Sequence, residues 1–407
     1  MIAGDPAIAK EVFTGSPDDL HAGAGNVILK PVLGSRSVLL LDGPEHMRQR
    51  KLMLPAFHGE RMRAYGELMS EIAERHIDRW PVGRSFAVRG STQAITLEII
   101  LRTVFGLETT AQVERLATPL RRLLDSTTSP LRLLSLQFTS SERGGPRSPW
   151  GRIRALLAPG DEMIYEQIRT RRAEVESGGG PERSDILSLL LAARDEEGQP
   201  LTDRELRDEL MTLLLAGHET TATALAWTME RVVRHPDVLA RLQDEARADG
   251  DGSASDYLEA TIKETLRLRP VVPGVIRRLQ RPLEIGGMAL PAGVHIAPSI
   301  YLIHRRADVY PEPEAFRPER FLGERTPSTY EWLPFGGGIR RCLGASFALY
   351  EMRIVLGAIL RRATIEPARD AGEPVVRRFV TFTPKRGGRV RVTGLAPARS
   401  AQPPVAA

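Results

Sequence analysis

Apolar residues recur every three or four positions through most of the chain, which is the spacing of helices with one buried face. One such stretch contains Leu68, Met69 and Ile72. Together with capping residues and prolines, this pattern predicts helices at 6–13, 44–51, 60–79, 91–107, 111–125, 161–177, 203–234, 256–269 and 347–361.

Short strands are predicted late in the chain. Runs bounded by glycine or proline occur at 283–285, 294–297, 379–382 and 389–392. Pro384 and Gly387-Gly388 separate the last two, so the pattern predicts that these two form a hairpin. Many helices and few strands predict a mainly α protein with small β-sheets, of the α+β class. We expect one domain over 1–395 and a disordered Pro/Ala-rich tail at 396–407.

The longest predicted helix has a clear start and end. Thr202 and Glu205 form a capping box, with Thr202 as the N-cap. His235-Pro236 ends the helical pattern after Arg234. A helix of about 32 residues is roughly 48 Å long, so it must cross the whole protein.

The middle of this helix, Ala216-Gly217-His218-Glu219-Thr220-Thr221, is unusual for a helix interior. Gly217 costs about 1 kcal/mol relative to alanine there. One face narrows to Ala216, Gly217 and Thr220, which leaves room for a flat partner. The alternative is a glycine kink in which the threonine hydroxyl bonds to a carbonyl of the preceding turn.

Cys342 is the only cysteine and lies in a loop rich in glycine and arginine, 332–344. Nearby arginines and a helix start two residues later should hold the sulfur towards its thiolate form. A single cysteine cannot build a zinc or iron–sulfur site from cysteines, but it can be the axial ligand of a haem. The alternative is a buried structural cysteine.

The spacing of Phe335, Gly338, Arg340, Cys342 and Gly344 resembles the haem-binding loop of the cytochrome P450 family. The resemblance covers nearly the whole chain and implies the fold of that family, with a long central helix over haem b and the cysteine loop on the proximal side. It implies that Cys342 ligates the iron and that Phe335, Gly338, Arg340 and Gly344 contribute to cofactor binding.

The run in the middle of the central helix also resembles a signature of this family. The resemblance implies that Ala216 and Gly217 lie over the haem. It makes Glu219 and Thr220 the catalytic pair that delivers protons during oxygen activation. His218 is interpreted as a packing residue.

His46 and Arg50 are one helical turn apart and share a face. Two such groups can hold a pair of carboxylates, and a haem has two propionates. Taken alone, the pattern favours an ordinary surface pair. The resemblance assigns both residues to the propionates, together with Arg277 and Arg340.

Glu264 and Arg267 are i,i+3 neighbours on a predicted helix. Alone, they predict a surface ion pair worth about 0–1 kcal/mol. The resemblance adds Arg320 from the segment 316–321. It implies that the three residues form one buried cluster bracing the cysteine loop.

The resemblance makes 14–41 the roof of a substrate pocket and 126–149 part of its lid. The wall of this pocket is expected to contain five apolar residues: Val271, Val272, Val275, Ile276 and Phe379. They indicate an apolar small molecule, such as a lipid, terpenoid or polyketide, but identify no substrate.

Composition excludes several classes of function. Lys and Arg exceed Asp and Glu by 56 − 51 = 5 and are dispersed, so no nucleic-acid partner is expected. The chain has no run of eighteen apolar residues, so no membrane span is predicted. A lone cysteine fits the reducing cytoplasm, and we expect a cytoplasmic monomer.

The resemblance implies a haem-thiolate monooxygenase that inserts one atom of O2 into an apolar C–H or C=C bond. The sequence contains no flavin or nicotinamide domain, so a separate ferredoxin and ferredoxin reductase are expected to supply electrons. Alternatives are a peroxide-using enzyme, an isomerase or dehydratase of the same fold, and a haem-binding but inactive protein or sensor. The last is considered because the first helix and two strands of most family members have no counterpart before 6–13.

Overall fold

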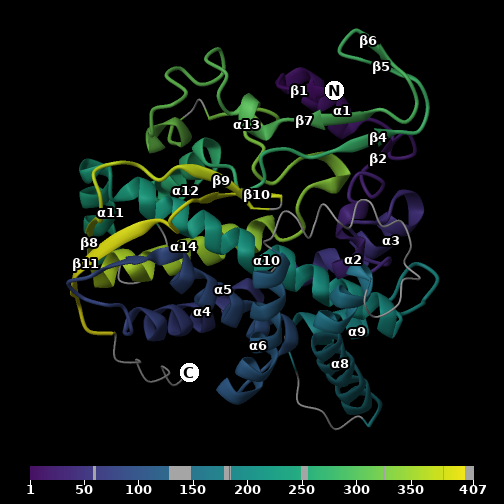
Figure 1. Cartoon of the computed structure of the whole chain (residues 1–407), viewed down its shortest axis with the longest axis horizontal. Coiled ribbons are helices and arrows are strands. Elements are labelled where there is room, and N and C mark those ends of the chain that lie inside the picture. Colours follow the sequence, from purple (N-terminus) through teal and green to yellow (C-terminus); the bar gives the residue numbers. More distant parts are fainter. Residues whose placement is uncertain are drawn as a thin grey trace.

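Helices form the body of the protein, and small sheets lie at its periphery (Figure 1). The structure is a computed structural model that describes residues 1–57, 61–127, 148–177, 183, 185–248, 255–323, 326–378 and 380–398. Most of the predicted lid at 126–149, Phe379 and the tail after residue 398 lie outside these ranges.

Most of the predicted helices are confirmed. The helices are α1 (Pro6–Thr14), α2 (Lys30–Leu33), α3 (Gly43–Met53), α4 (Arg61–Ile77), α5 (Val88–Phe105), α6 (Thr110–Thr127), α8 (Pro149–Glu176), α9 (Ile186–Ala192), α10 (Asp203–Val232), α11 (Pro236–Ala248), α12 (Asp256–Leu268), α13 (Ile300–Ile303) and α14 (Ala345–Arg362). Local signals set several of their ends. At α1, the side chain of Asp5 accepts hydrogen bonds from the backbone N–H groups of Ala7 and Ile8, and Pro6 occupies the first turn.

The central helix α10 begins at the predicted capping box, in which the side chains of Thr202 and Glu205 each accept a backbone N–H. It crosses the middle of the molecule in Figure 1 and packs along α5. The main apolar core gathers around α4, α5, α10 and α14. A smaller cluster joins α1 to α13 and to Leu333, at the start of the cysteine loop.

The sheets are small and mostly antiparallel. The strands are β1 (Ile2–Ala3), β2 (Leu20–His21), β3 (Ser85–Ala87), β4 (Arg277–Leu279), β5 (Leu283–Ile285), β6 (Met288–Leu290), β7 (His295–Pro298), β8 (Ala363–Pro367), β9 (Val375–Arg378), β10 (Thr381–Pro384) and β11 (Arg389–Leu395). They form sheets in the orders β1-β7-β4-β2, β3-β11-β8, β10-β9 and β5-β6, and β1 pairs with β7 in parallel.

The predicted hairpin between 379–382 and 389–392 is wrong. Strand β10 pairs with β9, whereas β11 pairs with β3 and β8 in a different sheet. Gly387 and Gly388 both have positive φ, and their carbonyls accept the N–H groups of the first two residues of α5. The glycine pair therefore turns the chain from one sheet into another and does not reverse it within one sheet.

Helix α8 begins well before its predicted start at residue 161. The side chain of Ser148 accepts the N–H of Gly151, and Pro149 occupies the first turn, where proline is tolerated. Pro159 resembles a helix break but lies inside the helix. Packing of α8 on α6 and α10 outweighs this local signal.

Candidate active site

The cysteine loop, residues 332–344, is held in shape by its backbone. The N–H of Cys342 donates to the carbonyl of Phe335 at 3.0 Å. Gly338 has a φ of +63°, and a Cβ at this position would lie 2.0 Å from the carbonyl oxygen of Phe13 in α1. Only glycine permits this close approach, so the loop is seated directly against α1.

Cys342 is exposed, although nearby protein atoms partly desolvate its sulfur. Burial raises the pKa of the Cys342 thiol, and the opposing effects of the Gly344 N–H, Arg50 and Arg341 are smaller. Without a bound metal ion, desolvation thus opposes the thiolate form that the sequence predicts for Cys342. A bound metal ion would deprotonate the thiol itself.

Helix α10 has an open face in its middle. Residues 221–230 are all buried, whereas Ala216 is exposed and Thr220 is half-buried. Gly217 faces α5 and not the open face, because a Cβ there would lie 2.9 Å from Cδ1 of Ile100 in α5. The structure thus places Ala216 and Thr220 on the open face, and Gly217 lets α5 approach.

The two predicted catalytic residues bond to different partners. The Glu219 carboxylate pairs with Arg89 and accepts a hydrogen bond from Gln93 at 2.6 Å, both from α5. The Thr220 hydroxyl donates to the carbonyl of Ala216 at 2.6 Å. A bond from the threonine hydroxyl to a carbonyl of the preceding turn is what the alternative interpretation, a glycine kink, expects. The helix has both this bond and the open face.

Sequence reasoning missed Arg89 and Gln93. Their i,i+4 spacing places them on one face of α5, but nothing local indicates that this face meets Glu219. His218 is buried, and its Nδ1 lies 2.8 Å from the carbonyl oxygen of Leu214. This position agrees with its interpretation as a packing residue.

Buried cationic and imidazole groups gather beside the cysteine loop. Burial, Arg340 and Arg50 lower the pKa of His46 to about 4, and its Nδ1 has no hydrogen-bond partner among the described residues. Arg277 is 6% exposed. In the described part of the chain its guanidinium forms no ion pair and donates to the carbonyl of Ile276. Burial lowers the pKa of Arg277 to about 10.

Arg340 differs because it already has an anionic partner. It pairs with Asp42 at 2.6 Å and also donates to carbonyls in the segment 38–41. Asp42 also accepts the N–H groups of Gly23 and Ala24, each at 2.9 Å. Sequence reasoning missed this residue, because Asp before Gly-Pro indicates only a helix N-cap, and Asp42 makes no side-chain cap bond to α3.

The charges of this group are unbalanced. Arg50, Arg277 and Arg340 carry three positive charges and Asp42 carries one negative charge, which gives 3 − 1 = +2. All four charges shift the pKa of His46, so they lie around its ring. Partly buried charges need counter-charges, and two carboxylates would supply them.

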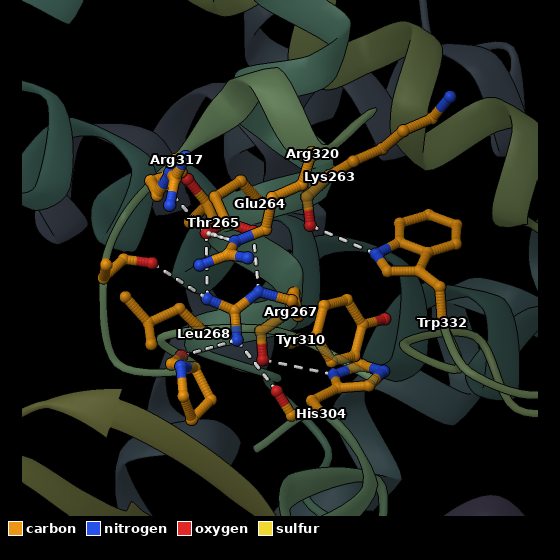
Figure 2. Close-up of polar contacts among 12 residues, drawn as sticks. Lys263, Glu264, Thr265, Arg267, Leu268, His304, Tyr310, Arg317, Arg320 and Trp332 are labelled. Atoms are coloured by element: carbon orange, nitrogen blue, oxygen red, sulfur yellow. Dashed lines mark hydrogen bonds and ion pairs between the residues drawn. The ribbon is translucent and has the colours of Figure 1, made fainter. Parts of the chain in front are cut away.

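A second charged group contains Glu264, Arg267 and Arg320 (Figure 2). Glu264 accepts two hydrogen bonds from Arg267, at 2.6 and 2.8 Å, and one from the N–H of Arg317 at 2.9 Å. The side chains of Glu264 and Arg267 have no exposed surface. Arg320 lies 3.4 Å from Glu264. The structure therefore brings the three residues of the predicted cluster together.

His304 connects this cluster to the cysteine loop, and Figure 2 shows its ring beside Arg267. Its Nδ1 donates to the carbonyl of Arg267 at 3.1 Å, and its Nε2 accepts the N–H of Leu333 at 2.8 Å. Burial lowers the pKa of His304 to about 3, so the ring is neutral near pH 7. Trp332 adds a second link by donating to the carbonyl of Lys263 at 3.1 Å. No sequence motif indicated His304.

The predicted pocket wall is divided in the structure. Val271 is buried, Val272 and Val275 are half-buried, and Ile276 is 41% exposed. Val275 packs on the small cluster that includes α1. Phe379 lies outside the described residues. The role of these residues in substrate binding stays a prediction.

Two kinds of feature are absent from the described part of the chain. Its His, Cys, Asp and Glu side chains form no group of three or more that could hold a metal ion. None of its helices is long and apolar enough to cross a membrane.

Comparisons with known proteins agree on one family. The family model described as cytochrome P450 matches residues 1–389. Cytochrome P450 135B1 of Mycobacterium tuberculosis is 44% identical over 390 residues, which cover 95% of this chain and 81% of that protein. Cytochrome P450 137 of the same organism is 41% identical, over 96% of this chain and 80% of that protein.

Solved structures give the same result for the fold. The haem domain of cytochrome P450DA has a TM-score of 0.82 at 26% identity, covering 97% of this chain and 87% of that one. The retinoic acid-bound cyanobacterial CYP120A1 also has a TM-score of 0.82, at 24% identity, covering 97% and 89%.

Proposed function

The chain belongs to the cytochrome P450 family of haem-thiolate monooxygenases, and from this premise we propose that it inserts one oxygen atom from O2 into an apolar organic substrate. The reaction would be a hydroxylation or an epoxidation. The observation that carries the proposal is the exposed Cys342 in its fixed loop, flanked by a cation group of net charge +2.

The residues present fit haem b, the cofactor of this family. Cys342 would ligate the iron, and the two propionates would balance the net charge of Arg50, Arg277, Arg340 and Asp42. The unpartnered Nδ1 of His46 offers a further hydrogen bond. When bound, the haem supplies the centre at which O2 is reduced and activated, and a thiolate ligand favours O–O cleavage.

On the opposite side of that centre, Ala216 and Thr220 would line the reaction space. The Thr220 hydroxyl would pass a proton onward there. Glu219 is the nearest acid in sequence, but neighbouring residues on a helix point about 100° apart. A water molecule or a rotation of Glu219 away from Arg89 would have to join the two side chains.

Electrons would come from separate proteins, a ferredoxin and its reductase. Arg341 and Ile339 are exposed on the cysteine loop, close to where the haem would sit. A cationic and apolar surface of this kind suits an acidic electron-transfer partner. The single cysteine supports work in a reducing compartment such as the cytoplasm.

The first experiment is the absorption spectrum of the purified protein after reduction and addition of carbon monoxide. We expect the strongly red-shifted Soret band of a thiolate-ligated ferrous haem. The Cys342→His variant should bind haem but give the shorter-wavelength band of neutral ligation. Wild-type protein that binds no haem, or that gives the same band as Cys342→His, would overturn the assignment of Cys342.

Product analysis then separates the reaction types. Compounds that shift the haem spin state are incubated with ferredoxin, reductase and a nicotinamide donor. We expect products heavier by one oxygen atom, with the label taken from ¹⁸O2. Products of unchanged mass formed without electrons would indicate an isomerase, and equal rates with hydrogen peroxide alone would indicate a peroxide-using enzyme. Oxygen consumption with no product from any compound would favour an inactive haem protein.

A further inference from the structure

Asp42 lies where three parts of the chain meet, and no step of the proposed reaction uses it. Its carboxylate accepts the N–H groups of Gly23 and Ala24, each at 2.9 Å, and pairs with Arg340 at 2.6 Å. The ring of His21 lies 3.6 Å away. The Asp42 side chain is 15% exposed, so solvent screens its charge only partly.

Gly23 is enclosed by this arrangement. A Cβ at Gly23 would lie 2.2 Å from the carbonyl oxygen of Leu40 and 2.8 Å from Oδ2 of Asp42. The first distance is too short for any side chain to be added without movement of the backbone, and the second would displace the Asp42 carboxylate. The contact between Asp42 and this turn is therefore built into the fold.

The segment 36–42, here called the strap, is fixed at its other end to α10. The N–H of Arg36 donates to the carboxylate of Asp208 at 2.9 Å, and the N–H of Val38 donates to that of Glu209 at 2.8 Å. The strap thus runs from the central helix to the cysteine loop, and the Asp42 carboxylate is its last anchor.

Asp42 also sets the charge of the cation group. With Asp42 present, the three arginines and the carboxylate sum to 3 − 1 = +2, which would balance the two negative charges of the propionates. Without this carboxylate the sum is +3, and one positive charge beside the cofactor has no counter-charge. Arg340 would also lose its only ion-pair partner in the described part of the chain.

We propose that Asp42 is a positioning residue that holds Arg340 and the strap in place and keeps the reduction potential of the bound haem low. This proposal rests on the haem binding of the proposed function. Hydrogen bonding and charge around a haem are established means of setting its potential. Reduction adds an electron, so removal of a nearby negative charge favours the reduced state and raises the midpoint potential.

The test is a redox titration of haem-loaded wild type, Asp42→Asn, Arg340→Gln, the double variant and Glu45→Gln. Asp42→Asn should raise the midpoint potential and Arg340→Gln should lower it, because the two changes alter the local charge in opposite directions. The double variant restores a charge of +2 and should return close to wild type. Glu45→Gln is the matched control, because Glu45 also pairs with the strap, through Arg36 at 3.2 Å, but is 66% exposed. Its charge is screened by solvent, so its loss should leave the potential close to that of wild type.

The carbon monoxide spectrum is recorded first for each protein, so that failure of haem binding in wild type is separated from failure of this inference. An unchanged potential in Asp42→Asn would overturn the proposal, and so would a shift of both single variants in the same direction, which a general disturbance of the fold would produce. If a single variant loses haem, the double variant must retain it. Loss of haem there as well would contradict the charge balance.

Discussion

Replacement of His304 by phenylalanine tests whether the buried ion cluster supports the cysteine loop. Phenylalanine keeps a ring of similar size but has no nitrogen. The N–H of Leu333 and the carbonyl of Arg267 would both lose their partner in a region where His304 has no exposed surface. Each unpaired buried group costs about 1–3 kcal/mol. The expected loss is roughly 2–6 kcal/mol, from a total stability of about 5–15 kcal/mol.

The pH dependence gives a second, independent prediction for His304→Phe. The folded protein holds the pKa of His304 at about 3, whereas an unfolded histidine has a pKa of about 6.5. Because the unfolded state binds a proton on this histidine more tightly, the folded protein loses stability as the pH falls below the unfolded pKa. At pH 5 the linkage amounts to about 2 kcal/mol, and at pH 8 it is close to zero. The stability gap between wild type and variant should therefore narrow by about 2 kcal/mol from pH 8 to pH 5.

Urea unfolding of the haem-loaded proteins measures both quantities. The Soret band in the presence of carbon monoxide follows the cysteine loop, and far-ultraviolet circular dichroism follows the helices. His235→Phe is the matched control, because His235 is half-buried and bonds to a carbonyl of α10 but has no contact with the cysteine loop. Equal stability of His304→Phe and wild type, or a gap that does not change with pH, would refute the role given to His304.

Three further outcomes are expected. Glu264→Ala leaves the guanidinium of Arg267 buried without its counter-charge, so the free energy of unfolding should fall by roughly 3–5 kcal/mol and the protein should lose haem. A soluble variant with full haem occupancy would contradict this. Thr220→Val should increase the share of reduced oxygen released as hydrogen peroxide, measured with ferredoxin and reductase. Thr221→Val removes an equivalent hydroxyl on the buried side of α10 and should leave the peroxide share unchanged. An equal rise in peroxide release in both variants would exclude Thr220 from the proton path. Burial raises the pKa of Glu351 well above its usual range, and neither carboxylate oxygen has a partner among the described residues. Because a raised pKa means that stability falls as pH rises, Glu351→Gln should gain stability over wild type from pH 5 to pH 8 in urea titrations, and parallel curves would disprove this.

Features set by neighbours in sequence were predictable. The capping box at Thr202 and the Asp5-Pro6 start of α1 are local hydrogen-bonding patterns, and they appear in the structure where the sequence places them. The ion pair of Glu264 and Arg267 needs only one turn of helix. Prediction failed at the start of α8, placed at residue 161, because the helix continues through Pro159 and packs on α6 and α10.

Features that depend on distant contacts were not predictable from one sequence. Asp42 resembles an ordinary helix cap, and its bond to Arg340 joins residues 298 positions apart. His304 belongs to no motif, because its partners are backbone groups whose identity the sequence does not encode. The pairing of β10 with β9 was missed for a related reason. Glycine positions indicate where a chain turns, but the strand that it meets afterwards depends on the whole fold.

The seating of Gly338 against Phe13 has a consequence for how the protein reaches its native state. The two residues are 338 − 13 = 325 positions apart, and the entropy of closing a loop grows with its length. Contacts of this range form slowly in folding. A growing chain cannot complete the cysteine loop until Gly338 has left the ribosome, long after α1 has been made. Capture of the cofactor is therefore a late event in biogenesis, and a nascent chain stalled before Gly338 would remain unable to hold haem.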